Sequence, residues 1–315
     1  MTEKGIARSC VYAKIGQLVQ GKLTPTENFI IPGITSTIFC TKTFIYQFDN
    51  HPEFSIPENV FPALYIYQKL VNGIDLSTIT RDEVLNISIV KDYVYEHMTS
   101  MKIVQHSNIP VGKGLSDGST NILSVLLALN KFHNTTFDKK ILYEICAKIL
   151  PTDPVLDNEI DLIFNPLTGE KVFNLIPKPF GIIYFDSDSS TIIDPKEIFQ
   201  KFNYTSADYV SFNEILEHFQ NGSVLNNYQL IFKAITMSSK INQTALPKPN
   251  FEKIIEFAEE NKMGVFVGHT GTVMGLLMDA DVMEKEFNKV KSFIKQTWNA
   301  KAYYDSCEQS VIKIL

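Results

Sequence analysis

A short segment in the first half of the chain combines glycines, hydroxyl residues and one lysine. It covers residues 109–121 and reads IPVGKGLSDGSTN. Glycine lets backbone N–H groups approach an anion closely and adopts positive φ without strain. The apolar run that follows predicts a buried helix over 120–132, and the N-terminus of a helix adds N–H donors and the positive end of its dipole. Such a loop is suited to hold phosphate groups, and Lys113 adds a point charge.

The spacing within this loop differs from two widespread phosphate-binding patterns. Lys113 precedes the second glycine of the segment, so the loop matches neither G-x-x-x-x-G-K-[ST] nor G-x-G-x-x-G. On its own, the loop is equally compatible with a tight turn in which Ser119 or Thr120 caps a core helix.

Strand and helix patterns alternate on both sides of the loop. Strands are predicted at 6–14, 29–31, 36–46, 101–105, 180–185 and 264–268, where β-branched and aromatic residues gather. Helices are predicted at 61–72, 120–132, 138–149, 195–202, 213–220, 228–237, 250–261 and 282–296. The stretch at 165–179 is rich in proline and is the expected domain boundary. This order of elements predicts an α+β protein.

Composition narrows the class of protein. The chain has 315 residues, 44% of them hydrophobic, and at about 150 residues per domain this length predicts two domains. A net charge of −6 argues against general nucleic-acid binding, which needs a clustered positive surface. No apolar run approaches the ~18 residues of a membrane span, and the N-terminus has no apolar signal core. The four cysteines lack metal-ligand spacing, so we expect a cytoplasmic protein with free thiols and no zinc.

Two further glycine-containing segments accompany the loop. Residues 13–21 read AKIGQLVQG, and residues 267–276 read VGHTGTVMGL. With the loop between them, the three segments resemble in order and separation the three motifs of the GHMP kinases, a superfamily of small-molecule kinases. Within it the chain is most similar to the L-threonine kinases of cobalamin side-chain synthesis. The likeness lies in residues 16–21, 109–114, 151–153 and 246–251, so it covers most of the chain.

This resemblance implies a two-domain α+β GHMP kinase fold. Residues 1–176 would form the ATP-binding N-terminal domain, like ribosomal protein S5 domain 2, and residues 177–315 a ferredoxin-like C-terminal domain. ATP and Mg²⁺ would be the cofactors, and the acceptor would lie in the cleft between the domains. The partner would be a small hydroxylated substrate, with no nucleic acid and no membrane, and a homodimer is one option.

The resemblance assigns chemistry to two residues. Asp153 would deprotonate or orient the acceptor hydroxyl, a role worth ~10²–10⁴-fold in rate, and Lys14 would stabilise charge on the transferring phosphoryl group. Taken alone, Asp153 reads as an aspartate in a Pro-x-Asp-Pro turn, and Lys14 as a solvated lysine at a strand end.

The remaining site residues follow from the same resemblance. The expected ATP contacts are Pro110, Gly112, Lys113, Gly114, Leu115, Ser116, Gly118, Ser119 and Thr120. The expected metal ligands are Asp117 and Ser119. The expected substrate contacts are Gln20, Thr152, His269 and Thr270.

The chain departs from the family pattern at three places. Asp117 and Gly118 stand where relatives usually carry two adjacent serines. Either Asp117 takes over a Mg²⁺ contact, since Mg²⁺ commonly binds one or two carboxylates, or a local shift lets Ser119 or Thr120 serve. Leu150 replaces an acid before Pro-Thr-Asp, and Gln17 stands where an acid is common.

These features together predict an enzyme that moves the γ-phosphoryl group of ATP to a hydroxyl group. L-Threonine or a similar hydroxy-amino acid is the first expected acceptor. A homoserine-like compound, a sugar or an isoprenoid alcohol is the alternative. A non-catalytic regulator with the same fold is a further alternative, favoured by the Asp117-Gly118 replacement.

Overall fold

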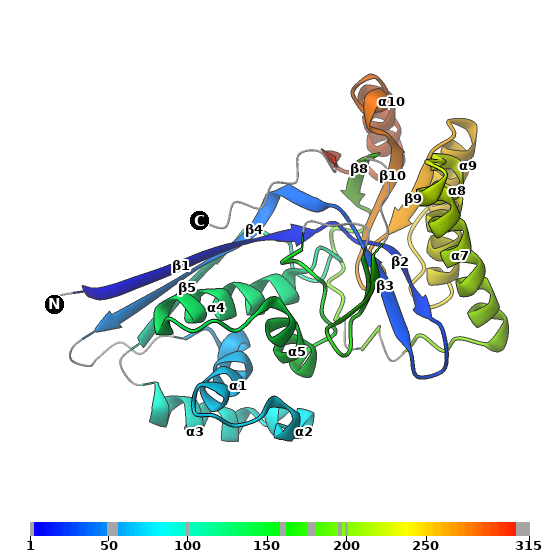
Figure 1. Cartoon of the computed structure of the whole chain (residues 1–315). Coiled ribbons are helices and arrows are strands. Elements are labelled where there is room, and N and C mark those ends of the chain that lie inside the picture. Colours follow the sequence, from blue (N-terminus) through cyan, green and yellow to red (C-terminus); the bar gives the residue numbers. More distant parts are fainter. Residues whose placement is uncertain are drawn as a thin grey trace.

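The computed structural model describes residues 3–48, 56–98, 101–157, 162–174, 180–194, 197–198 and 201–306. Its strands form two antiparallel sheets, one with the order β1-β4-β5 and one with the order β11-β8-β10-β9-β2-β3-β6-β7 (Figure 1). The boundary predicted after residue 176 and part of the helix predicted over 195–202 lie outside the described residues.

The smaller sheet carries a layer of helices on one face (Figure 1). Its strands are β1 (Glu3–Lys14), β4 (Thr35–Phe48) and β5 (Met101–Ser107). The helices are α1 (Phe61–Val71), α2 (Arg81–Leu85), α3 (Ile87–His97), α4 (Asp117–His133) and α5 (Lys139–Ile149), with short 3₁₀ turns at Glu58–Val60 and Leu76–Thr78. Helix α4 is apolar on nearly all sides because it lies between β1 and β4 above and α1 and α5 below.

The larger sheet joins strands from both ends of the chain. Its members are β2 (Gln17–Lys22), β3 (Asn28–Pro32), β6 (Leu162–Asn165), β7 (Glu170–Asn174), β8 (Phe180–Asp186), β9 (Gly264–Val267), β10 (Val273–Asp279) and β11 (Tyr303–Ser306). Strand β2 meets β9 where Gln17 pairs with Val267. This pairing brings the first motif beside the third, although about 250 residues separate them in the sequence.

Helices cover both faces of the larger sheet. They are α7 (Ser206–Val224), α8 (Tyr228–Asn242), α9 (Phe251–Glu260) and α10 (Ala280–Trp298). Successive residues of β8 point to opposite faces, as in any strand. Ile182 and Tyr184 pack with residues of α7 and α8, whereas Ile183 and Phe185 pack with residues of α9 and α10.

Most predicted helices and strands are present, with shifted ends. The helix predicted over 213–220 is the longer α7, which begins after a capping box formed by Thr205 and Asp208. The helices α2 and α3 were not predicted, and neither were the strands β2, β6, β7, β10 and β11. For β10, glycines in the third motif favoured a loop, but this strand is buried between two neighbouring strands.

Within the described ranges, no helix combines the length and apolar character needed to span a membrane. Three of the four cysteines lie in those ranges, and Cys10, Cys40 and Cys146 are all free thiols.

Candidate active site

Residues 109–116, here called the glycine loop, are held by three other parts of the chain. Three successive carbonyls of the loop each accept a backbone hydrogen bond. The pairs are Gly112 O with Ile193 N at 3.2 Å, Lys113 O with Val273 N at 3.0 Å, and Gly114 O with Gly16 N at 3.0 Å. The first and third motifs therefore both dock on the glycine loop, and each satisfies one of its carbonyls.

Small residues make this docking sterically feasible. A Cβ atom on Gly271 would lie 2.0 Å from the backbone nitrogen of Gly114 and 2.0 Å from the carbonyl carbon of Lys113. Gly112, Gly114 and Ser116 all adopt positive φ, at 67°, 81° and 56°. The glycines of the second and third motifs thus serve a close approach of two backbones and a left-handed turn.

Asp117 is the first residue of α4, directly after the glycine loop. Its carboxylate accepts backbone hydrogen bonds from Gly112, from Gly118 and from its own N–H. Burial raises the pKa of Asp117, and these three N–H groups lower it in part. The carboxylate therefore holds donors of the kind that a phosphate oxygen would use at a helix N-terminus.

A cavity of about 200 Å³ opens beside the start of α4. Nine of the predicted site residues line it: Gln20, Gly114, Ser116, Asp117, Gly118, Ser119, Thr152, Asp153 and Thr270. Other lining residues are Gln17, Ile30, Leu150, Pro151, Pro166 and Asp194. All three motifs and the Pro-Thr-Asp turn thus contribute to one cavity.

Asp153 is partly buried at the edge of this cavity. Its backbone N–H donates to Ser119 Oγ at 2.9 Å, and its Oδ1 accepts from Gln17 Nε2 at 2.8 Å. Burial is the main cause that raises the pKa of Asp153, and the charge of Asp117 raises it as well. Hydrogen bonds from Gln17 and Ser116 and the charge of Lys14 lower it in part. A carboxylate with a raised pKa in the lining of a cavity is suited to accept a proton.

Gln17 was noted in the sequence only as a departure from the family pattern, and the structure makes it part of the site. Its Oε1 accepts a hydrogen bond from the backbone N–H of His269 at 3.2 Å. Because a backbone N–H can only donate, this contact orients the amide so that Nε2 faces Asp153. The position of Gln17 in the first motif was the only signal that could have identified it.

Lys14 and Thr120 are buried just behind the cavity lining. Lys14 is 0% exposed, and its charge favours the ionised form of Asp153. Its backbone carbonyl lies 3.4 Å from the Ser116 hydroxyl. Thr120 Oγ1 donates to Ser116 O at 2.6 Å, so this hydroxyl contacts the turn before α4.

His269 is buried behind the cavity as well. Its Nε2 lies 3.1 Å from Ser238 Oγ on α8, and the same hydroxyl accepts from the backbone N–H of Gln20 at 3.1 Å. Burial lowers the pKa of His269 to about 3, so the ring is neutral near pH 7. Its predicted contact with substrate stays a prediction, since its ring faces α8.

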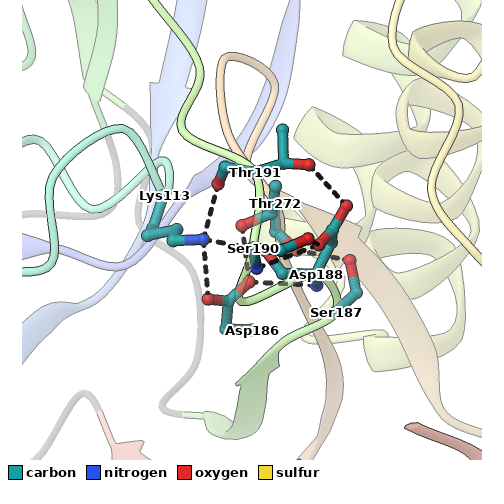
Figure 2. Close-up of polar contacts among 7 residues, drawn as sticks. All are labelled: Lys113, Asp186, Ser187, Asp188, Ser190, Thr191 and Thr272. Atoms are coloured by element: carbon teal, nitrogen blue, oxygen red, sulfur yellow. Dashed lines mark hydrogen bonds and ion pairs between the residues drawn. The ribbon is translucent and has the colours of Figure 1, made fainter.

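Pro110, Lys113 and Leu115 line a different cavity of about 480 Å³, next to β8 and β11. Figure 2 shows the Lys113 ammonium surrounded by oxygens of residues 186–191. Its contact with a triphosphate stays a prediction, and its placement favours another role, argued below.

The side chains of the 200 Å³ cavity that could bind a metal ion present mainly oxygen atoms. In the part of the chain that the structure describes, no three His, Cys, Asp or Glu side chains cluster closely enough to hold a metal ion by themselves. Asp117 and Asp153 nevertheless line one cavity together with the Ser119 hydroxyl. This set fits Mg²⁺, which typically binds one or two carboxylates together with water and substrate phosphates.

Known proteins resemble this chain in sequence over part of its length. Residues 84–153 match the family described as GHMP kinases N terminal domain. An L-threonine kinase of Salmonella typhimurium is 23% identical over 180 residues, which cover 57% of this chain and 60% of that protein. An L-threonine kinase of Citrobacter freundii is 22% identical over 190 residues, which cover 60% of this chain and 66% of that protein. Both matches span less than two thirds of these curated relatives.

Solved structures resemble nearly the whole chain. A homoserine kinase from Cytophaga hutchinsonii superposes with a TM-score of 0.63 at 10% identity, covering 97% of this chain and 95% of that chain. A Streptococcus pneumoniae phosphomevalonate kinase, in complex with phosphomevalonate and AMPPNP, superposes with a TM-score of 0.63 at 12% identity. This match covers 96% of this chain and 100% of that chain. Residues 84–153 thus match the GHMP kinase N-terminal family, and nearly the whole chain shares the fold of solved small-molecule kinases.

Proposed function

We propose that the protein transfers the γ-phosphoryl group of ATP to a hydroxyl group of a small metabolite. One observation carries the proposal: the N-terminus of α4, the glycine loop and the Asp153 carboxylate all face a single cavity. Phosphoryl transfer asks a protein mainly to position the reactants and to stabilise charge. The helix N-terminus positions the phosphate groups, and the carboxylate positions the acceptor hydroxyl.

Each of the site residues has its own part in the proposed reaction. The acceptor oxygen attacks the γ-phosphorus, the bond to the bridging oxygen breaks, and ADP leaves. Asp153 receives the hydroxyl proton, and Gln17 orients the carboxylate through its hydrogen bond to Oδ1. Lys14 stabilises negative charge near the transferring group, and the loop N–H groups hold the phosphates. Mg²⁺, held by Asp117 and Ser119, would neutralise phosphate charge when bound.

The acceptor is proposed to be L-threonine or a similar hydroxy-amino acid. Two relatives named L-threonine kinase support this choice. A cavity of about 200 Å³ favours a small acceptor, and Gln20, Thr152 and Thr270 line it with polar groups. A role in cobalamin side-chain synthesis belongs to the same proposal.

ADP release from ATP and Mg²⁺ across a panel of hydroxy-amino acids, sugars and alcohols tests the proposal. We expect turnover with one acceptor class and its loss in Asp153→Ala. Nucleotide binding without turnover on any acceptor would favour a regulator, the second candidate, which the Asp117 carboxylate directly after the glycine loop supports. A folded protein that neither binds nor turns over ATP contradicts both.

A further inference from the structure

The ammonium of Lys113 sits in a cage of oxygen atoms supplied by the segment after β8. Its Nζ lies 2.8 Å from Asp188 O, 2.6 Å from Thr191 O and 3.0 Å from Asp186 Oδ2 (Figure 2). The Lys113 side chain is only 8% exposed. Three oxygens at these distances, one of them charged, form the surroundings that a bound monovalent cation would have.

The cage is organised by contacts that do not involve the lysine. The Asp188 carboxylate accepts hydrogen bonds from Ser190 Oγ at 2.6 Å and from Thr191 Oγ1 at 2.6 Å, and its pKa is lowered to about 2. Asp186 Oδ1 accepts from Thr272 Oγ1 at 2.5 Å. The segment 186–191 is therefore folded around its own carboxylates, which leaves the carbonyls of Asp188 and Thr191 directed at the ammonium.

Residues close to the cage are hydrogen-bonded to the backbone of Lys113 and of its neighbour Gly112. Ile193 N donates to Gly112 O, and Val273 N, next to Thr272, donates to Lys113 O. At Gly112 an added Cβ would lie 2.7 Å from Ile193 O, so the two segments touch closely. The ammonium thus lies at the centre of the contact between the glycine loop and the C-terminal half of the chain.

We propose that Lys113 is a positioning residue whose ammonium acts as a tethered monovalent cation. Seated in the oxygen cage, it holds the glycine loop in the conformation in which its carbonyls bond to the surrounding segments and the N–H groups that Asp117 does not occupy are left for phosphate. The link to phosphate rests on the proposed function, whereas the link to loop conformation does not. If the charge and size of the ammonium carry the role, a small free cation should replace it when the side chain is removed.

Two variants separate the cation from the side chain. Lys113→Ala empties the cage, whereas Lys113→Met removes the charge but leaves the stem in place. Lys301→Ala is the matched control, because Lys301 lines the same 480 Å³ cavity but places its Nζ 4.8 Å from the centre of the Tyr303 ring. All proteins are kept in buffer whose cation is tetramethylammonium, which is too large for the cage.

Amide hydrogen exchange at Ile193 and Val273 is the first readout, and it needs no nucleotide. We expect faster exchange in both Lys113 variants, recovery in Lys113→Ala on adding ethylammonium or K⁺, and no recovery in Lys113→Met. Lys301→Ala should exchange as the unmodified protein does. Unchanged exchange in Lys113→Ala, or faster exchange that neither cation reverses, overturns the proposal.

Affinity for MgATP is the second readout. We expect the affinity of Lys113→Ala to fall roughly tenfold to a hundredfold, the usual range for losing a hydrogen bond to a charged group, and to recover with ethylammonium. Unchanged affinity in Lys113→Ala overturns the link to phosphate. If the unmodified protein binds no ATP, the proposed function fails, and the exchange experiment alone still decides the role of Lys113.

Should Lys113→Ala not fold, Asp186→Asn tests the same contact from the cage side. It keeps the lysine and removes one charged oxygen, so exchange at Ile193 and Val273 should again rise. Combined with Lys113→Met it should add nothing further, because the two residues act as a pair. Additive effects would contradict the pairing.

Discussion

Gln17 Nε2 donates a hydrogen bond to Asp153 Oδ1 across 2.8 Å, and this contact joins the first motif to the proposed catalytic carboxylate. The amide is oriented from behind by the backbone N–H of His269. An acid at this position would place a second negative charge beside Asp153. The glutamine instead supplies a donor that favours the ionised form of the carboxylate.

Gln17→Leu should move the acid limb of the kcat/KM profile to higher pH. Burial already raises the pKa of Asp153, and removing a donor to the carboxylate raises it further. Gln105→Leu is the control, because this amide also makes partly buried hydrogen bonds, at 2.8 Å to Asn121 O and 3.2 Å to Ser124 Oγ, but lies outside the cavity lining. An acid limb that moves equally in both variants would contradict the role given to Gln17.

Asp153→Asn should lower turnover ~10²–10⁴-fold while MgATP still binds, since the amide cannot accept the proton. Its effect on stability has a defined sign. At pH values between the unfolded pKa and the raised folded pKa, Asp153 is protonated in the folded state and ionised in the unfolded state. Its contribution to stability therefore falls as pH rises through the folded pKa. Asp153→Asn should therefore gain stability over the unmodified protein near pH 7 and lose that gain in acid. Urea unfolding at both pH values checks this, and an advantage that is larger in acid would be inconsistent with it.

Asp117→Ser should bind ATP more tightly in the absence of Mg²⁺. The carboxylate occupies N–H groups of Gly112 and Gly118 and repels phosphate unless a cation lies between them. We expect a gain of roughly tenfold, the equivalent of about 1.4 kcal/mol, measured by calorimetry in EDTA. Asp117→Asn keeps the shape without the charge and should behave in the same way. Metal-free affinity that is unchanged in both variants would exclude a role for the Asp117 charge.

Gly271→Ala should destabilise the fold by about 1–3 kcal/mol and weaken nucleotide binding. The new Cβ would meet backbone atoms of Lys113 and Gly114 at 2.0 Å, and backbone cannot move aside as a flexible side chain does. Gly73→Ala is the comparison, because nothing lies within 4 Å of the added Cβ and the alanine would be strained only by the positive φ at this position. Urea unfolding and MgATP titration of both variants test this. Nucleotide affinity that falls equally in Gly73→Ala would point to global destabilisation.

Lys248 should make stability depend on pH in the alkaline range. Burial lowers its pKa from 10.5 to about 7. Its Nζ contacts two neutral oxygens, Asn242 Oδ1 at 3.1 Å and Leu246 O at 3.3 Å. Between these pKa values the unfolded state binds a proton that the folded state lacks, so stability rises with pH, by up to about 1.4 kcal/mol per unit.

Urea unfolding of the unmodified protein and of Lys248→Met, from about pH 7 to about pH 10, measures this dependence. The difference between the two proteins should change with pH in favour of the lysine as pH rises. Lys240→Met serves as a control, since Lys240 is an exposed lysine on α8. A difference that stays constant across the range would show that the pKa of Lys248 is not lowered.

The sequence by itself determined which segments belong to the candidate site. Glycine spacing and the apolar run after residue 120 identified the loop and α4, because positive φ and a buried helix impose residue types locally. The three ordered motifs indicated a resemblance to the GHMP kinases; the family match over residues 84–153 agrees with it, and the solved structures confirm the fold. Nine predicted residues line one cavity, which supports the site but leaves each role to experiment.

Only the tertiary structure decided which of these residues face each other. The pairing of Gln17 with Val267 in one sheet brings distant motifs together, and no local pattern specifies a contact across that separation. Lys113 shows the same limit, because its position in a glycine loop suggested a phosphate ligand. Its long side chain instead reaches oxygens of residues 186–191, since the direction of a flexible side chain depends on what the rest of the fold places around it.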